Sequence, residues 1–362
     1  MKRQFRYRIY PTKKQKNRMN MILSECCWLY NHLLELRIKT YQETNVSLSN
    51  YDCQKMFKSI KEERPSLNVI HSQSVQQVSE RIELAFQSFF RRIKSGEKPG
   101  FPRFKGIGWY DSFTYPQSGF KISNNKLILS KIGYINIKLH RPIEGKIKRL
   151  TVKRTPTGKW FVSFIVDVEP KPLPMSSEII GIDLGLKKYA TLSNGETIDA
   201  PKFFRIEEKS LAKSKRKYQK EKNKKNKKVM ARIHERIGNK RLNWCNQLAY
   251  TLVKSFQIIV FEDLDVKSMQ QNGFNKGFNK SLTDAAWGKL INSTQSAAES
   301  ATRTVVLVNP CNTSQLCSQC GILVKKSLSE RTHKCDCGLE IDRDLNAACN
   351  ILALGLQRLA KA

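Results

Sequence analysis

The chain has 362 residues, and its 65 lysines and arginines outnumber 31 aspartates and glutamates, which gives a formal charge of +34. So large an excess of one sign favours work against a polyanion, and nucleic acid is the polyanion we expect. No run approaches the roughly 18 apolar residues of a membrane span, and the first residues lack the apolar core of a signal peptide. We therefore expect a cytoplasmic, nucleoid-associated protein of two or more domains.

Strand and helix patterns alternate over the first 170 residues. Residues 4–10 alternate apolar and basic side chains, which is the period of a half-buried strand. Apolar residues then recur at helical spacing over 13–40 and 72–94 and predict two amphipathic helices. Four strand patterns follow, at 126–130, 134–140, 147–154 and 159–168. The helices therefore interrupt a sheet that begins near residue 4, and we expect that sheet to be a small barrel.

Aromatic and basic residues are interleaved in the turn-rich stretch after Gly96. Arg103, Lys105 and Lys121 could contact phosphates while the neighbouring aromatic rings stack on bases. The same aromatic residues could equally pack the core of the barrel. The sequence leaves both interpretations open.

A second region begins after an extended, proline-rich linker at 171–178. The segments IIGIDLG and KYATLSNG predict a hairpin that places Asp183 inside a sheet, where an unpaired carboxylate is costly. A bound metal ion would relieve that cost.

Residues 202–228 contain thirteen lysines and arginines and three glutamates, and a helical pattern continues from there to about residue 256. A solvated pair of basic helices would explain this composition. One wall of a nucleic-acid channel would explain it as well, and this is the interpretation we favour because a strand with carboxylates follows. That strand, QIIVFEDL, ends at Glu262, with Asp263 and Asp265 as alternatives.

The next segment, 266–281, contains the tandem GFNKGFNK and predicts a Gly/Asn-rich loop that acts as a mobile lid. A helix over 283–302 and the strand TVVLVNP are expected after it.

Four cysteines follow in the pattern Cys317-x2-Cys320-x14-Cys335-x-Cys337, close to the spacing of a zinc ribbon. This spacing predicts one structural Zn²⁺ held by the four thiolates. Because the C-x-C pair is tighter than the usual C-x2-C, His333 is a less favoured substitute ligand. A zinc ion with four protein ligands has no open position for water, so we expect no catalysis there.

Asp183, Glu262 and Asp344 are the candidate catalytic residues. Each carboxylate alone has an ordinary structural explanation as a turn or helix-cap residue. Together, the three lie where a nuclease of the RNase H type needs ligands for two divalent cations, Mg²⁺ or Mn²⁺. Asp344 opens a predicted helix, whose dipole favours an ionised carboxylate in the first turn.

The chain resembles the transposon-encoded TnpB (OrfB) family, whose RuvC-like nuclease is related to type V CRISPR effectors. The resemblance rests on GFPRFK, SFTYP, GIDLG, FEDL, DAAW, VNPCNTSQLCSQCG and DRDLNAACNI, which occur in the family's order. It implies that Asp183, Glu262 and Asp344 bind the catalytic Mg²⁺ ions. It also implies a guide RNA derived from the transposon end, together with double-stranded target DNA and its displaced single strand. Cys311 and the short CDC pair depart from the family pattern.

The resemblance further implies a multidomain α+β architecture. An oligonucleotide-binding-like wedge domain is expected at 1–12 and 96–170, and a helical recognition domain at 13–95 is inserted into it. A RuvC-like α/β domain is expected at 179–310 and 338–362, with a zinc-ribbon insertion at 311–337.

Three functions fit these features. An RNA-guided DNA endonuclease that cuts next to a short flanking motif is favoured. A nuclease-inactive, RNA-guided regulator is the main alternative, although such a chain would be expected to lose one of the acids. A transposase is less favoured because no separate N-terminal helix-turn-helix module stands out.

Overall fold

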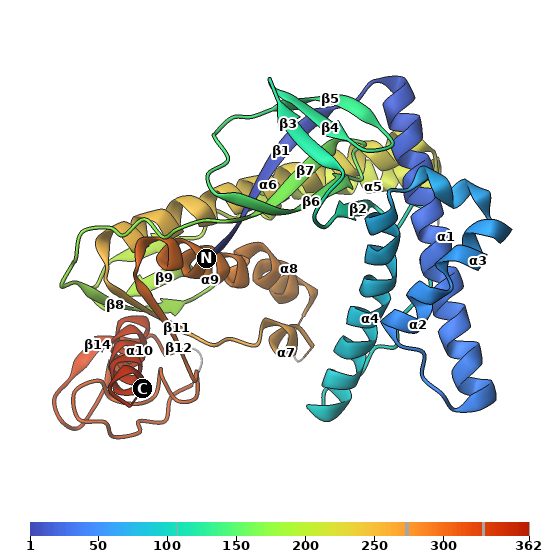
Figure 1. Cartoon of the computed structure of the whole chain (residues 1–362). Helices are drawn as coiled ribbons and strands as arrows, with labels where there is room; N and C mark the ends of the chain where they lie inside the picture. The colour runs from blue at the N-terminus through green and yellow to red at the C-terminus, as the bar shows by residue number, and fades with distance from the viewer. Residues whose placement is uncertain (107, 272–274, 328–329, 362) are drawn as a thin grey trace. The chain divides into compact units, whose positions relative to one another are not determined.

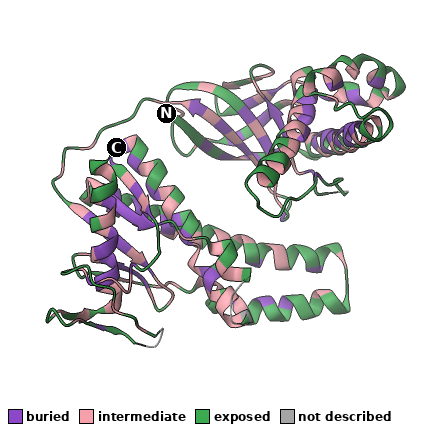
Figure 2. Ribbon diagram, turned by 90° about the horizontal axis from the view of Figure 1, so that it is seen from below, coloured by how far each residue is buried: buried purple, intermediate pink, exposed green. Residues whose placement is uncertain are grey.

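The computed structural model describes every residue except 107, 272–274, 328–329 and 362 (Figure 1). The chain forms two compact units, Lys2–Val168 and Glu169–Ala362, the second of which also includes Met1. Buried residues lie along the strands of both units (Figure 2). None of the helices within the described ranges is both long and apolar enough to cross a membrane.

The first unit contains a seven-stranded antiparallel sheet in the order β2-β6-β7-β1-β5-β4-β3. Strand β1 (Lys2–Tyr10) pairs with β7 (Trp160–Asp167) and, at its end, with β5 (Gly133–Lys138). The other strands are β2 (Ser112–Tyr115), β3 (Phe120–Ser123), β4 (Lys126–Leu129) and β6 (Lys146–Arg154). The predicted alternation in β1 is confirmed, because Phe5, Tyr7 and Ile9 are buried.

Helices inserted between β1 and β2 share one apolar core with this sheet. The two predicted helices are α1 (Lys13–Thr44) and α4 (Ser72–Lys94). Thr12 and Gln15 form a capping box at the start of α1, which fixes the boundary between strand and helix. The sequence did not indicate the short elements between them, which are α2 (Asn50–Lys55), α3 (Phe57–Glu63) and the 3₁₀ helix η1 (Pro65–Val69).

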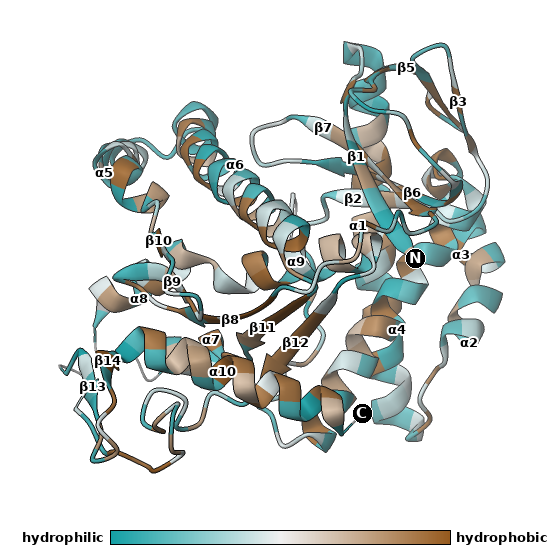
Figure 3. Cartoon of the chain, turned by 90° about the vertical axis from the view of Figure 1, so that its left-hand side faces the viewer, coloured by the Kyte–Doolittle hydropathy of each residue, from teal (hydrophilic) through white to brown (hydrophobic). Residues whose placement is uncertain are grey.

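The second unit contains a five-stranded sheet in the order β10-β9-β8-β11-β12. The strands β8 (Ile179–Leu184), β11 (Ile258–Glu262) and β12 (Thr304–Val308) are parallel, as short apolar runs buried on both faces favour (Figure 3). The predicted hairpin pairs β8 with β9 (Lys188–Leu192), and β10 (Thr197–Asp199) extends it at the edge.

Helices cover both faces of this sheet. On one face, α6 (Lys224–Ser255) and α9 (Trp287–Ala301) pack on residues such as Ile180, Ile182 and Phe261. On the other face, α10 (Arg343–Ala360) packs on Val260 and Val306. Because side chains alternate along a strand, Asp183 and Glu262 belong to the face that α10 covers.

Helix α10 approaches this sheet closely because two glycines leave room for it. A Cβ atom on Gly181 of β8 would overlap the backbone of α10, lying 2.7 Å from the Leu352 nitrogen and nearer still to the Ala348 oxygen. A Cβ atom on Gly355 of α10 would lie 2.5 Å from Val260 Cγ2. The close contact of α10 with β8 therefore depends on Gly181, and its close contact with β11 depends on Gly355.

The basic run 202–228 covers all of α5 (Phe203–Lys220) and the start of α6. The two helices pack through Leu211, Ile233 and Ile237. Glu207 is buried in α5 and forms ion pairs with Arg236 and Lys240 of α6.

The expectation of a loop over 266–281 is wrong for the residues that the structure describes. Helices α7 (Val266–Gln271) and α8 (Lys276–Ala285) cover them except for Asn275, and the proposed lid falls in part on 272–274, which lie outside the described residues. The carboxylate of Asp265 accepts the N–H of Lys267 and Ser268, and the side chain of Asn275 accepts the N–H of Phe278. These polar residues are helix caps, which composition alone does not distinguish from loop residues.

Helix α9 begins four residues later than the expected 283 because Ala286 adopts a left-handed backbone conformation, with φ of 54°, that separates α8 from α9. The cysteine-containing segment adds a two-stranded ribbon of β13 (Thr332–Lys334) and β14 (Glu340–Asp342).

Candidate active site

The structure brings the three predicted acids together. Ile182 of β8 pairs in register with Phe261 of β11, so Asp183 and Glu262 occupy equivalent positions at the carboxyl ends of adjacent parallel strands. Asp344 lies in the first turn of α10, which packs on the same face of the sheet. Each strand and the helix therefore supply one carboxylate to a single site.

The electrostatics of Asp183 reflect the two neighbouring acids. Burial first, and then the negative charges of Glu262 and Asp344, together raise the pKa of the Asp183 carboxyl from 3.8 to about 8. Arg343 opposes the change. Burial also raises the pKa of Glu262, while a hydrogen bond from Thr313 lowers it. Such mutual repulsion among partly buried carboxylates is what a cation bound among them would relieve.

The alternatives to Glu262 are placed elsewhere. Asp263 is exposed, and its backbone N–H continues the pairing with β12 by donating to Val308. Asp265 caps α7. Glu262 is 6% exposed and is the acid of this segment that faces the site.

Contacts around Asp342 and Arg343 fix the start of α10. The Asp342 side chain accepts the N–H groups of Asp344 at 2.8 Å and Leu345 at 3.2 Å, and Lys188 Nζ lies 3.4 Å from its other oxygen. Although burial opposes the change, these donors hold the pKa of Asp342 below its usual range. The Arg343 guanidinium donates to Ser327 O and Ser314 Oγ. The position of Asp344 is thus set by a capped and anchored helix terminus.

Three buried polar residues next to the site were not predicted from the sequence. Thr313 Oγ1 donates to Glu262 Oε1 at 2.5 Å. On α10, Asn346 and Asn350 donate to backbone carbonyls of the segment that contains Thr313. The one available signal was the presence of two asparagines, spaced i and i+4, on the otherwise apolar stripe of the helix.

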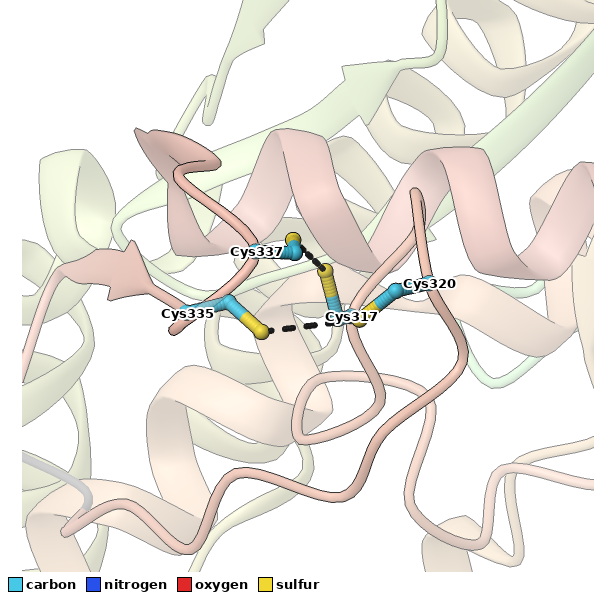
Figure 4. A group of neighbouring side chains, drawn as sticks. All are labelled: Cys317, Cys320, Cys335 and Cys337. Carbon is cyan, nitrogen blue, oxygen red and sulfur yellow. Dashed lines mark hydrogen bonds between the residues drawn. The ribbon is translucent and has the colours of Figure 1, made fainter.

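The four predicted cysteine ligands form a second site in the same unit (Figure 4). Their sulfur atoms all lie within 4.8 Å of one another, with Cys317 Sγ 3.6 Å from Cys337 Sγ and Cys320 Sγ 3.6 Å from Cys335 Sγ. Four thiolates at the usual Zn–S distance of about 2.3 Å on a tetrahedron are about 3.8 Å apart. The cluster therefore suits a structural zinc ion.

His333 is buried beside this cluster but does not belong to the group of four sulfur atoms. Its Nδ1 atom contacts Lys326 Nζ. Burial opposes ionisation of Cys317, yet the N–H groups of Cys320 and Gln319, with His333, bring the pKa of its thiol down to about 6. A thiolate at this position is the form that binds a metal ion.

The basic residues predicted to contact nucleic acid are exposed. Arg103, Lys105 and Lys121 all lie on the surface of the first unit, and the Lys105 backbone is held by the Asn31 side chain at both N–H and C=O. The aromatic residues around them fall into two groups. Phe113 and Tyr115 are buried, as core packing requires, whereas Phe101, Phe104 and Trp109 are exposed, as base stacking requires.

Three family models match the chain. Residues 1–45 match a model described as a helix-turn-helix domain, residues 163–273 one described as "Probable transposase", and residues 287–351 the TNB domain of Cas12f1-like proteins. In the structure, the first of these matches consists of strand β1 and the single helix α1, so it does not form a helix-turn-helix.

Full-length relatives extend these matches. A protein of Streptomyces pristinaespiralis named "Putative RNA-guided DNA endonuclease" is 32% identical over 369 residues, which cover 98% of this chain and 90% of the relative. InsQ of Escherichia coli K12, which carries the same description, is 30% identical over 382 residues, covering 98% and 93%. The solved Cas12f1–sgRNA–target DNA complex aligns with a TM-score of 0.59 at 16% identity, covering 94% of this chain and 83% of that one.

The fold is thus shared with a Cas12-type effector. At 30–32% identity to relatives along nearly its whole length, the chain belongs to the TnpB (OrfB) family.

Proposed function

We propose that this protein is an RNA-guided DNA endonuclease that cuts guide-matched DNA next to a short flanking motif by metal-dependent phosphodiester hydrolysis. The convergence of Asp183, Glu262 and Asp344 on one face of the second sheet carries the proposal. The names of the relatives from Streptomyces and Escherichia coli support the same activity.

The three acids suit hard divalent cations. Carboxylate oxygens are the ligands that Mg²⁺ and Mn²⁺ prefer, and rigid strands hold two of the three carboxylates. A pair of such ions supplies an activated water and stabilises the leaving 3′ oxygen. The side chains of Asp183, Glu262 and Asp344 would hold the ions, and Asp342 would keep Asp344 in place by capping α10.

The cysteine cluster has a structural role in this proposal. Four thiolates complete the coordination of zinc and leave no site for a substrate. The cluster lies between β12 and α10 along the chain, so zinc would order the connection that leads into the helix of Asp344.

Nucleic-acid binding is assigned to the basic surfaces. In the proposal, the lysine-rich helices α5 and α6 and the exposed cations of the first unit contact the guide RNA, the target DNA and its displaced strand. Pairing with the guide reads the target sequence, while the protein contacts the backbones and the flanking motif.

The test compares DNA binding and DNA cutting by the same guide-loaded samples. Asp183→Ala, Glu262→Ala and Asp344→Ala should bind matched DNA like the wild type in a gel shift and should fail to cut it in Mg²⁺. Asp263→Ala is the matched control for Glu262→Ala, because Asp263 is the adjacent acid but is exposed. Cutting by the three variants at the wild-type rate would refute the assignment. Tight binding without any cutting by the wild type would favour the nuclease-inactive regulator instead.

A further inference from the structure

The segment between β12 and the cysteine cluster contacts both the candidate metal site and α10. Thr313 is 4% exposed, and its hydroxyl lies 2.5 Å from Glu262 Oε1. The same hydroxyl lies 3.1 Å from the Pro310 carbonyl oxygen. A hydroxyl donates a single proton, and the nearer, charged acceptor forms the stronger bond, so the proton belongs to Glu262.

Glu262 needs such a partner. It is 6% exposed at the end of a buried strand, and rotation of its side chain would move both carboxylate oxygens relative to the site. The hydrogen bond to Oε1 restrains this rotation, and Oε2 is the oxygen that would then bind a cation.

Two asparagines of α10 hold Thr313 in turn. Asn350 Nδ2 donates to Thr313 O at 2.8 Å and to Leu316 O at 2.7 Å, and Asn346 Nδ2 donates to Leu316 O at 2.7 Å. The Ser318 N–H donates to Asn346 Oδ1 at 3.0 Å. Cys317 lies between Leu316 and Ser318, so residues 313–318 are fixed by α10 along their length and by the cysteine cluster near their end.

We propose that Thr313 is a positioning residue of the nuclease site: its hydroxyl orients Glu262 for metal binding, and the docking of residues 313–318 on α10 links that orientation to zinc. This inference rests on the proposed function. It assigns to the zinc cluster an effect on the metal affinity of the carboxylate site, beyond the folding of the segment that holds the zinc.

The direct test is Mn²⁺ binding to the guide-loaded protein, measured by the electron paramagnetic resonance signal of the free ion. Residues that hydrogen-bond a metal ligand typically contribute 10- to 100-fold to metal affinity. Thr313→Val, which keeps the shape and removes the donor, should therefore weaken Mn²⁺ binding by about 10- to 100-fold. Thr313→Ser, which keeps the hydroxyl, should restore most of it.

Thr294→Val is the matched control. Thr294 is fully buried in the same unit, and its hydroxyl donates to Leu290 O within α9, so its loss should leave Mn²⁺ affinity unchanged. Wild-type Mn²⁺ affinity in Thr313→Val would overturn the inference. Equal losses in Thr313→Val and Thr313→Ser would overturn it as well, because they would indicate a general packing defect.

Cys320→Ala tests the link to zinc, since it should lower Mn²⁺ affinity in the same direction as Thr313→Val. Unchanged Mn²⁺ affinity in a zinc-free Cys320→Ala protein would overturn the link.

Glu262→Gln separates this inference from the proposed function. If Glu262→Gln loses Mn²⁺ binding and Thr313→Val does not, only the positioning role is wrong; if Glu262→Gln binds Mn²⁺ normally, the metal site itself is wrong and the inference falls with it.

Discussion

Replacing Gly181 with alanine tests whether the close contact between β8 and α10 builds the active site. The added Cβ atom would lie 2.7 Å from the Leu352 nitrogen, about 0.7 Å short of ordinary contact at 3.4 Å. Because the obstructing atoms belong to the helix backbone, no side-chain rotation relieves the overlap. Helix α10 must therefore move away from β8, and Asp344 moves with it.

The expected size of the effect follows from two opposing contributions. Alanine in a strand gains about 0.5–1 kcal/mol of backbone entropy over glycine. Overpacking of a well-packed interface costs about 1–3 kcal/mol and more where backbone must shift. We expect a net loss of about 1–2 kcal/mol, or about 2–8 °C in melting temperature for a unit of this size. A displacement of catalytic groups near 1 Å can cost about 100-fold in rate, so cutting should fall far more than stability.

Gly238→Ala is the control for this experiment. Gly238 lies inside α6 with no atom within 4 Å of an added Cβ, so alanine should stabilise the protein by about 1 kcal/mol through helix propensity alone. Thermal melting and cleavage of matched DNA are measured for both variants. If Gly181→Ala melts and cuts like the wild type, the packing argument is wrong.

Four further outcomes are expected. The protein should copurify with a structured RNA, and its RNA affinity should fall steeply with salt because its charge is +34; a salt-independent affinity would contradict the electrostatic argument. Metal analysis should find about one zinc per chain, lost in Cys320→Ala, and an active, zinc-free wild type would refute the zinc site. Since burial and the charges of Glu262 and Asp344 raise the pKa of Asp183 from 3.8 to about 8, its ionisation costs the metal-free fold stability as pH rises between these values. Asp183→Asn should therefore raise the melting temperature in EDTA at pH 8 but not near pH 4, and an equal change at both would argue against a strained carboxylate. Asp342→Ala, which removes the cap of α10, should lower the free energy of unfolding by about 1 kcal/mol and also reduce cutting. Reduced stability with unchanged cutting would show that the cap does not position the active site.

Elements with a long or strong period could be predicted from the sequence. Local signals predicted the ends of several elements to within a few residues. These signals are the alternation of β1, the apolar stripes of α1 and α4, and the apolar runs of β8 and β11. Short helices such as α2 and α3 span too few residues to show a clear hydrophobic period. The Gly/Asn-rich stretch was mistaken for a loop because Asn275 and Asp265 are equally typical of loops and of helix caps.

The candidate acids could be chosen from the sequence because each ends a buried strand or opens a helix. Their convergence could not be derived in this way, because the pairing of β8 with β11 joins residues about eighty positions apart. Thr313 illustrates the same limit. Its hydroxyl matters only because Glu262 and Asn350 meet it in space, and neither is near it in the chain.

The most direct test of the proposed function is to sequence the RNA that copurifies with the protein and to offer the protein DNA that matches the guide portion of that RNA. We predict that the complex cuts this DNA in Mg²⁺, leaves it intact in EDTA, and leaves unmatched DNA intact in both. Cutting that persists in EDTA, or that ignores the match to the RNA, would contradict an RNA-guided, metal-dependent nuclease.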